Sequence, residues 1–155
     1  MANFLILKNH LALLMLLFTY YSGDFNVSAQ QFRPGFVYTR NRGRCTPQYW
    51  SSRRESWPKM VPQTSTVSKI FGSRAYERYR YDLTLLEAAG RNDDGDNVFA
   101  RLVKQSTAAL LNSYARQNYP YSAWEVKTML IQALVSEKSA SVLAQQLSQA
   151  NEACN

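Results

Sequence analysis

The chain has 155 residues, of which 46% are apolar, and this is the size and composition of one ordinary folded domain. Its 18 Lys and Arg residues outnumber its 11 Asp and Glu residues, which gives a formal net charge of +7 at pH 7. With only two cysteines, the sequence cannot build a zinc site from four thiolates.

Residues 1–29 have the layout of a secretory signal peptide. Lys8 is the early positive charge, residues 11–18 are an unbroken apolar run, and residues 27–29 (Val-Ser-Ala) suit cleavage. A membrane anchor is the alternative, but the run is shorter than the about 20 apolar residues of a spanning helix. Cleavage would remove His10, the one histidine. The mature chain would then lack the imidazole of a Ser-His or Cys-His pair and of a histidine-ligated zinc site.

Residues 30–44 contain a proline, two glycines and four arginines without helical periodicity, which predicts a flexible basic arm. The arm begins a basic half of the chain. Residues 30–80 contain eleven Lys and Arg but two Glu, whereas residues 81–155 contain six cations and eight anions. This asymmetry suggests an anionic partner, and solubility alone is the competing explanation. For an exported chain we expect acidic polysaccharide, acidic protein or a charged lipid surface, and no nucleic acid.

Residues 46–62 contain three prolines and two tryptophans, which predicts turns with one short helical piece near residues 51–57. Beyond residue 64 the apolar spacing becomes helical. Residues 64–72 and 73–90 are predicted helices, the second with Tyr76, Tyr79, Leu83, Leu86 and Ala89 on one face.

The C-terminal part of the chain predicts longer helices. Asp96 is expected to cap a helix over residues 97–117, whose inward stripe ends at Tyr114. Ser122 and Glu125 form a capping box for the next helix, and residues 139–154 continue the pattern. Because no segment alternates as a strand does, residues 45–155 are predicted to form an all-α domain, a bundle of four to five helices.

The two cysteines, Cys45 and Cys154, stand just before and just after the predicted bundle. In an exported chain two cysteines most simply form one disulfide, which here would join the ends of the domain. Arginines beside Cys45 would also lower the pKa of a free thiol, so a reactive cysteine is the less favoured alternative.

Short motifs occur in a fixed order over residues 45–154: CTPQYW, WP, TVSKIFG, LVKQSTAALLNS, YPYS followed by EVK, and ANEAC. Together they resemble the C-terminal domain of plant protodermal factor-type proteins, which are exported and associated with epidermal cell walls. They are also similar to bacterial extracellular modules that open with Cys-Thr-Pro-x-aromatic-Trp. The resemblance implies an extracellular, non-catalytic domain of the cell wall or apoplast. Two features differ. Only the short arm of residues 30–44 stands where protodermal factors have a long Pro-rich region, and residues 51–53 read Ser-Ser-Arg where the bacterial modules have Lys-Asn-His.

The candidate ligand-binding residues follow Cys45 and are aromatic or cationic: Tyr49, Trp50, Arg53, Arg54 and Trp57. Rings stack on sugar faces and guanidinium groups bind carboxylates in a bidentate manner, so this set is suited to an acidic sugar. The competing interpretation, which we favour for the two tryptophans, is that they belong to the core.

Other polar clusters do not predict a site. Residues 92–96 (Asn-Asp-Asp-Gly-Asp) hint at calcium, but an EF-hand loop would require Gly at Asn97 and Glu at Val103. Carboxylates for a hydrolase are available, but nothing in the sequence pairs two of them across a cleft: Glu77, Asp82, Glu87, Glu125 and Glu137. No catalytic residue, metal or cofactor is predicted.

The sequence therefore predicts a secreted, non-catalytic structural or interaction protein of the plant extracellular matrix. Its expected partner is acidic cell-wall polysaccharide, bound through residues 33–59 and 69–80. A secreted protein-recognition or signalling module is the alternative, and a carboxylate-based hydrolase is less favoured.

Overall fold

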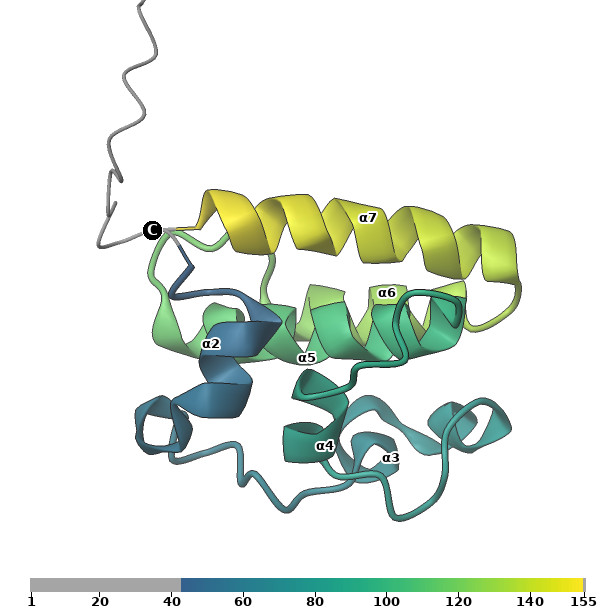
Figure 1. Ribbon diagram of the computed structural model, residues 1–155, viewed down its shortest axis with the longest axis horizontal. Helices are drawn as coiled ribbons and strands as arrows, with labels where there is room; N and C mark the ends of the chain where they lie inside the picture. The colour runs from purple at the N-terminus through teal and green to yellow at the C-terminus, as the bar shows by residue number, and fades with distance from the viewer. Residues whose placement is uncertain (1–42, 155) are drawn as a thin grey trace, which may run out of the picture. The chain divides into compact units, whose positions relative to one another are not determined.

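The structure is a computed structural model that describes residues 43–154 (Figure 1). The predicted signal peptide of residues 1–29 lies outside the described residues. So does the predicted basic arm of residues 30–44, apart from Gly43 and Arg44.

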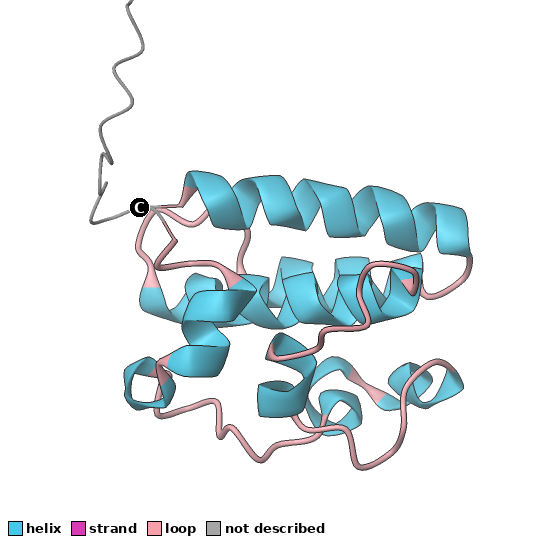
Figure 2. Ribbon diagram, in the orientation of Figure 1, coloured by secondary structure: helices cyan, strands magenta, loops and turns pink. Residues whose placement is uncertain are grey.

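The described residues are helical, and they form no strand beyond a single bridge between Thr66 and Thr84 (Figure 2). The all-α fold class is therefore confirmed. The α-helices are α2 (Pro47–Ser52), α3 (Val67–Phe71), α4 (Leu85–Ala89), α5 (Val98–Ala115), α6 (Ala123–Ala133) and α7 (Glu137–Ala153). Two 3-10 helices, η1 (Arg54–Ser56) and η2 (Ser73–Glu77), lie between them.

Helix α5 is the centre of the arrangement. It packs against α2, α4, α6 and α7. In Figure 1, α7 lies along one side of α5 and α6, and the short helices α2, α3 and α4 lie on the other. The core between these layers contains fully buried leucines from several helices, including Leu85, Leu102, Leu110, Leu111, Leu130 and Leu147.

Short polar side chains define where the helices begin. Each α-helix of residues 43–154 has a Ser, Thr or Asn side chain that accepts a hydrogen bond from a backbone N–H of its first turn. The capping box predicted for Ser122 and Glu125 is confirmed, and Thr84 with Glu87 forms a second one. The predicted cap Asp96 is wrong by one residue, because Asn97 accepts from the N–H of Ala100 at 3.0 Å.

The single helix predicted over residues 73–90 is wrong. The chain forms η2, turns, and starts again at α4, because the capping box at Thr84 begins a new helix. The segment before α4 is held by the bridge between Thr66 and Thr84. There the N–H of Val67 donates to the carbonyl of Leu83 at 2.8 Å. Consequently Tyr76 is 56% exposed instead of facing the core with Tyr79. Tyr114, which was predicted to end the inward stripe of α5, is 40% exposed, so that part of the prediction is also wrong.

The predicted disulfide between Cys45 and Cys154 is confirmed. The two Cα atoms lie 5.8 Å apart although 109 positions separate them in sequence. The start of α2 and the end of α7 meet at one end of the bundle (Figure 1). This crosslink closes a loop of a size that, in the chain-entropy account, stabilises the fold by about 4.7 kcal/mol.

We predict that replacing both cysteines (Cys45→Ser with Cys154→Ser) lowers the free energy of unfolding by about 3–5 kcal/mol. Urea unfolding followed by circular dichroism measures the loss. Equal midpoints for the two proteins would show that the disulfide does not limit stability.

We also predict a pH dependence from the two capping boxes. The backbone and side-chain hydrogen bonds from Thr84 lower the pKa of Glu87, and those from Ser122 lower the pKa of Glu125. A carboxylate with a lowered folded-state pKa stabilises the fold above its unfolded value of about 4.3, and this contribution disappears as the pH falls through the folded value. Glu87→Gln with Glu125→Gln should therefore flatten the loss of stability below about pH 4.3. Glu152→Gln, at the far end of α7, is the matched control and should retain the full loss.

Candidate functional site

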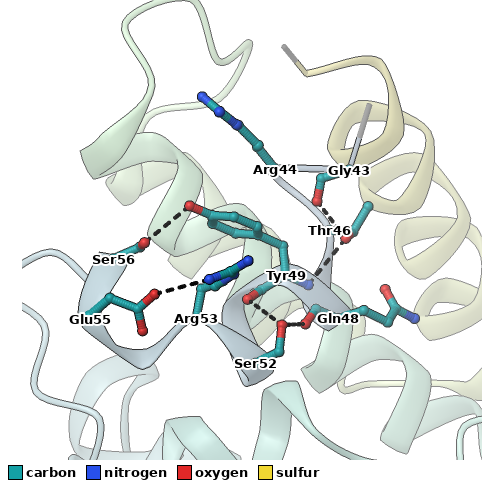
Figure 3. A pocket seen from close by; sticks show the side chains of 9 residues that line it. All are labelled: Gly43, Arg44, Thr46, Gln48, Tyr49, Ser52, Arg53, Glu55 and Ser56. Carbon is teal, nitrogen blue, oxygen red and sulfur yellow. Dashed lines mark hydrogen bonds and ion pairs between the residues drawn. The ribbon is translucent and has the colours of Figure 1, made fainter. Parts of the chain in front are cut away.

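An open polar hollow of about 540 Å³ lies beside the disulfide end of the domain (Figure 3). Its walls come from the segment before α2, from α2 itself and from η1. The lining residues are Gly43, Arg44, Thr46, Gln48, Tyr49, Ser52, Arg53, Glu55 and Ser56. Two of the predicted ligand-binding residues, Tyr49 and Arg53, are therefore brought together at one surface.

Local hydrogen bonds shape this hollow. The Thr46 hydroxyl caps α2 by accepting from the N–H of Tyr49 at 3.3 Å, and it donates to the carbonyl of Gly43 at 2.9 Å (Figure 3). The Tyr49 hydroxyl donates to Ser56 Oγ at 3.1 Å, which joins α2 to η1 across the hollow. The half-buried ring of Tyr49 is thus fixed in position before any ligand arrives.

Cations surround the Tyr49 ring. The guanidinium group of Arg116 lies 5.8 Å from the centre of this ring and 5.4 Å from that of Trp50, in cation–π geometry. Arg44 and Arg53 line the hollow and are exposed, and the only carboxylate in the lining is Glu55, which faces Arg53 at 3.7 Å. The ion pair of Arg53 with Glu55 is solvent-exposed and therefore weak. The guanidinium groups of Arg44 and Arg53 thus both remain available to an anion.

The surroundings of Tyr49 shift the pKa of its phenol. The hydrogen bond between Tyr49 and Ser56 lowers the pKa of the Tyr49 phenol, and the charges of Arg116 and Arg44 act in the same direction. A phenol pKa falls when its surroundings favour negative charge.

The two tryptophans of the predicted set do not present stacking surfaces. Trp50 is completely buried and Trp57 is 8% exposed, so both rings belong to the core. Their N–H groups are satisfied internally, because Trp57 Nε1 donates to the carbonyl of Trp50 at 2.7 Å and Trp50 Nε1 donates to Asn112 Oδ1 at 2.9 Å. Arg54, the remaining member, is an exposed residue of η1 outside the lining of the hollow.

A buried amide network supports the hollow from behind. Asn112 of α5 and Asn151 of α7 are both completely buried, and Asn112 Nδ2 donates to Asn151 Oδ1 at 2.8 Å. Asn112 Nδ2 also donates to the carbonyl of Cys45 at 2.8 Å, and its Oδ1 accepts from Trp50. The segment that carries the hollow is thereby bound directly to α5 and, through Asn112, to Asn151 of α7.

Asn151 uses all of its hydrogen-bonding capacity. Its Nδ2 donates to the backbone and side-chain oxygens of Gln105, at 3.1 and 3.0 Å, and its Oδ1 accepts from Tyr119 and from Asn112. Burial raises the pKa of the Tyr119 phenol, which keeps this hydroxyl a donor. A fully satisfied polar network of this kind specifies one arrangement of the elements it joins.

The second basic segment predicted to bind a partner, residues 69–80, is arranged differently. Arg74 and Arg80 are exposed and pair with Glu77 at 3.6 Å and Asp82 at 3.3 Å. Arg78 lies 4.4 Å from the centre of the Phe99 ring and donates to the carbonyl of Leu134 at 3.2 Å, so it joins η2 to α5 and to the end of α6. Arg78 is therefore held by internal contacts, whereas the ion pairs of Arg74 and Arg80 are solvent-exposed and weak and leave these two cations available to an anion.

Two acidic residues of the turn before α5 pair with cations. Asp93 pairs with Arg91, and Asp94 pairs at 3.0 Å with Lys104, whose side chain is 8% exposed. Residues 43–154 contain no group of three His, Cys, Asp or Glu side chains placed to hold a metal ion. None of the helices in this range has the length and apolar character needed to cross a membrane.

Sequence reasoning missed Arg116 and Trp124. Arg116 comes from the end of α5, far in sequence from the hollow, and donates to the carbonyl of Arg44 at 2.9 Å. Trp124, which the sequence analysis left unassigned, is the exposed tryptophan at 76%. No local pattern identifies either residue, because their placement depends on how distant helices pack.

A comparison with protein families matches residues 45–154 to the family described as protodermal factor 1 C-terminal domain. The chain belongs to this family. The matched range begins and ends at the disulfide cysteines. No curated protein and no solved structure gave a significant match.

The geometry explains what the ordered motifs of this protodermal factor domain contribute. The first motif supplies Cys45 and Trp50, the motif ending in LLNS supplies Asn112, YPYS supplies Tyr119, and ANEAC supplies Asn151 and Cys154. These motifs, dispersed along the sequence, meet in one buried cluster beside the disulfide.

We predict that Asn112→Ala lowers the free energy of unfolding by about 2–4 kcal/mol, because it leaves the N–H of Trp50 and the carbonyl of Cys45 buried without a partner. Urea unfolding measures the change. Asn118→Ala, at an exposed position in the following turn, is the control and should change stability by less than about 0.5 kcal/mol. Equal losses for the two variants would contradict the structural role of the network.

Proposed function

We propose that this protein is a non-catalytic component of the plant extracellular matrix and that its domain binds acidic polysaccharide at the hollow beside the disulfide. The observation that carries the proposal is the combination of a fixed Tyr49 ring with the exposed guanidinium groups of Arg44 and Arg53 in one open hollow.

The chemistry of a uronic-acid residue suits these groups. The C–H face of a pyranose ring stacks on an aromatic side chain, and its carboxylate accepts two parallel hydrogen bonds from a guanidinium group. The hollow is open, as is required for a site that contacts one residue within a long polymer chain. Because α2 and η1 are joined by hydrogen bonds and anchored to the core, the Tyr49 ring is held in place without a large ordering cost.

A non-catalytic role is supported by the use of the acidic side chains. Glu87 and Glu125 serve their own capping boxes, and Glu77 and Asp82 pair with neighbouring arginines. Glu55, the carboxylate of the hollow, faces Arg53. A glycoside hydrolase requires two carboxylates on opposite sides of the scissile bond, and the lining of the hollow supplies one.

An extracellular location is supported by three independent features. The N-terminal residues have the layout of a signal peptide, the domain contains an intramolecular disulfide, and the family is that of a plant protodermal factor. Disulfides persist in oxidising compartments such as the cell exterior. Cell-wall association follows as part of the same proposal.

We expect retention on immobilised polygalacturonate at low ionic strength that weakens steadily as salt is added, because the contacts are between exposed charges. Arg53→Gln and Arg44→Gln should each reduce the association constant by about 3- to 10-fold, and Tyr49→Ala should reduce it as well. Lys138→Gln, an exposed cation on α7 outside the hollow, is the matched control and should have little effect.

Three outcomes would contradict the proposal. Retention that is insensitive to salt would exclude a charge-based contact. Equal effects of Arg53→Gln and Lys138→Gln would show that net charge, and not the hollow, is responsible. Binding to a protein ectodomain without binding to the acidic glycan would favour the alternative of a protein-recognition module.

A further inference from the structure

A second open hollow, of about 610 Å³, adjoins the first at the end of α7. Its described lining consists of Gly43, Thr46, Gln149, Glu152 and Ala153. Gly43 and Thr46 line both hollows, so the segment before α2 is the ridge between them. In Figure 3 these two residues lie at the other edge of the first hollow from Glu55 and Ser56. The ridge is low at Gly43, because the space in which its side chain would begin is open. A polymer bound in the first hollow can therefore continue into the second.

The two hollows differ in charge. The first contains the guanidinium groups of Arg44 and Arg53, whereas none of the described residues that line the second is a cation. The one ionisable side chain among them is that of Glu152, which is exposed and forms no ion pair within residues 43–154. Ser148 Oγ donates to Glu152 Oε1 at 3.1 Å, which positions this carboxylate without neutralising its charge.

We propose that Glu152 determines which acidic polysaccharide the protein binds. The preferred ligand is a partly esterified polyuronate, in which an uncharged ester residue in the second hollow neighbours the charged residue held by Arg44 and Arg53. This inference rests on the proposed function and specifies its ligand. A second carboxylate beside Glu152 is disfavoured, because two like charges at close range repel each other. Esterification removes that charge and keeps a carbonyl oxygen that accepts hydrogen bonds.

The other side chains of the second hollow suit an ester group. Gln149 precedes Glu152 by three positions on α7, so the two exposed side chains share one face of the helix. The amide of Gln149 supplies N–H donors for the ester carbonyl. The exposed methyl group of Ala153 offers an apolar contact to the alkyl part of the ester. Donor, apolar contact and repelling charge therefore lie together in one hollow.

The two ends of α7 provide a matched pair of carboxylates. Glu137 begins the helix and Glu152 lies 15 positions later, which is about 22 Å along the helix axis. At about 0.15 M ionic strength the Debye length is about 8 Å, so each exposed carboxylate acts mainly on its own surroundings. Glu137→Gln and Glu152→Gln remove the same charge from the protein, but only the second removes it from the hollow.

Isothermal titration calorimetry of the full-length, disulfide-bonded protein tests the inference at this ionic strength. The two probes are a hexagalacturonate with all carboxylates free and one with half of them converted to methyl esters. Glu152→Gln should raise the association constant for the fully charged probe about 2- to 5-fold and change that for the half-esterified probe by less than about 1.5-fold. Glu137→Gln should leave both association constants unchanged.

A second pair of variants tests the contact with the ester carbonyl. Gln149→Ala should weaken binding of the half-esterified probe by about 2- to 5-fold, because it removes a hydrogen-bond donor. Gln145→Ala, at an exposed position one turn earlier and outside the described lining of both hollows, is the control and should have no effect.

Three results would overturn the inference. The first is an equal gain for both probes with Glu152→Gln, which would show no selection against a second charge. The second is an equal effect of Glu137→Gln, which would assign the gain to net charge. The third is an equal effect of Gln149→Ala and Gln145→Ala. In each case the proposed function stands where Arg53→Gln still weakens binding. If neither probe binds, the proposed function is wrong and the inference falls with it.

Discussion

The hydrogen bond between the buried amides of Asn112 and Asn151 is the interaction on which the arrangement at the disulfide end depends. It joins α5 to α7, and the same two amides bind Trp50, Tyr119, Gln105 and the carbonyl of Cys45. The disulfide constrains the distance between the two ends of the domain, but a crosslink alone does not orient a segment. The amides supply the orientation, because each donor and acceptor fits one partner geometry.

The aromatic rings and arginines around Cys45 belong partly to the core and partly to the hollow. The segment after the cysteine inserts Trp50 and Trp57 into the core, and Tyr49 stacks edge-on against Trp50 with ring centres 5.1 Å apart. Arg116 then covers both rings and binds the backbone of Arg44. The buried tryptophans thus support the surface hollow, and Arg116 holds the Tyr49 ring and the backbone of Arg44 at its rim. A ring fixed in this way is preorganised for a ligand.

The fold was largely predictable from local signals, and the site was not. The all-α class, the disulfide, and the capping box of Ser122 with Glu125 follow from residue types at fixed spacings. The break between η2 and α4 was missed, because the periodicity of Tyr76, Tyr79 and Leu83 fits a continuous helix. The contact that decides against it is the hydrogen bond from Val67 to Leu83, which joins residues 16 positions apart. The burial of Trp50 and Trp57 agrees with the interpretation favoured from the sequence. The hydrogen bond from Trp50 to Asn112, 62 positions away, could not be predicted, because contacts of that range leave no local pattern.

The start of α6 and the hollow rest on different physical causes. The hollow depends on the amide network and on the disulfide, whereas the position of Trp124 is set by the first turn of α6, where Ser122 and Glu125 fix the entry of the chain. Tyr121, just before this cap, is half-buried and receives a hydrogen bond from Gln146 of α7 at 2.9 Å. Because the two regions share no residue, a change that removes the charges of the hollow leaves the start of α6 intact.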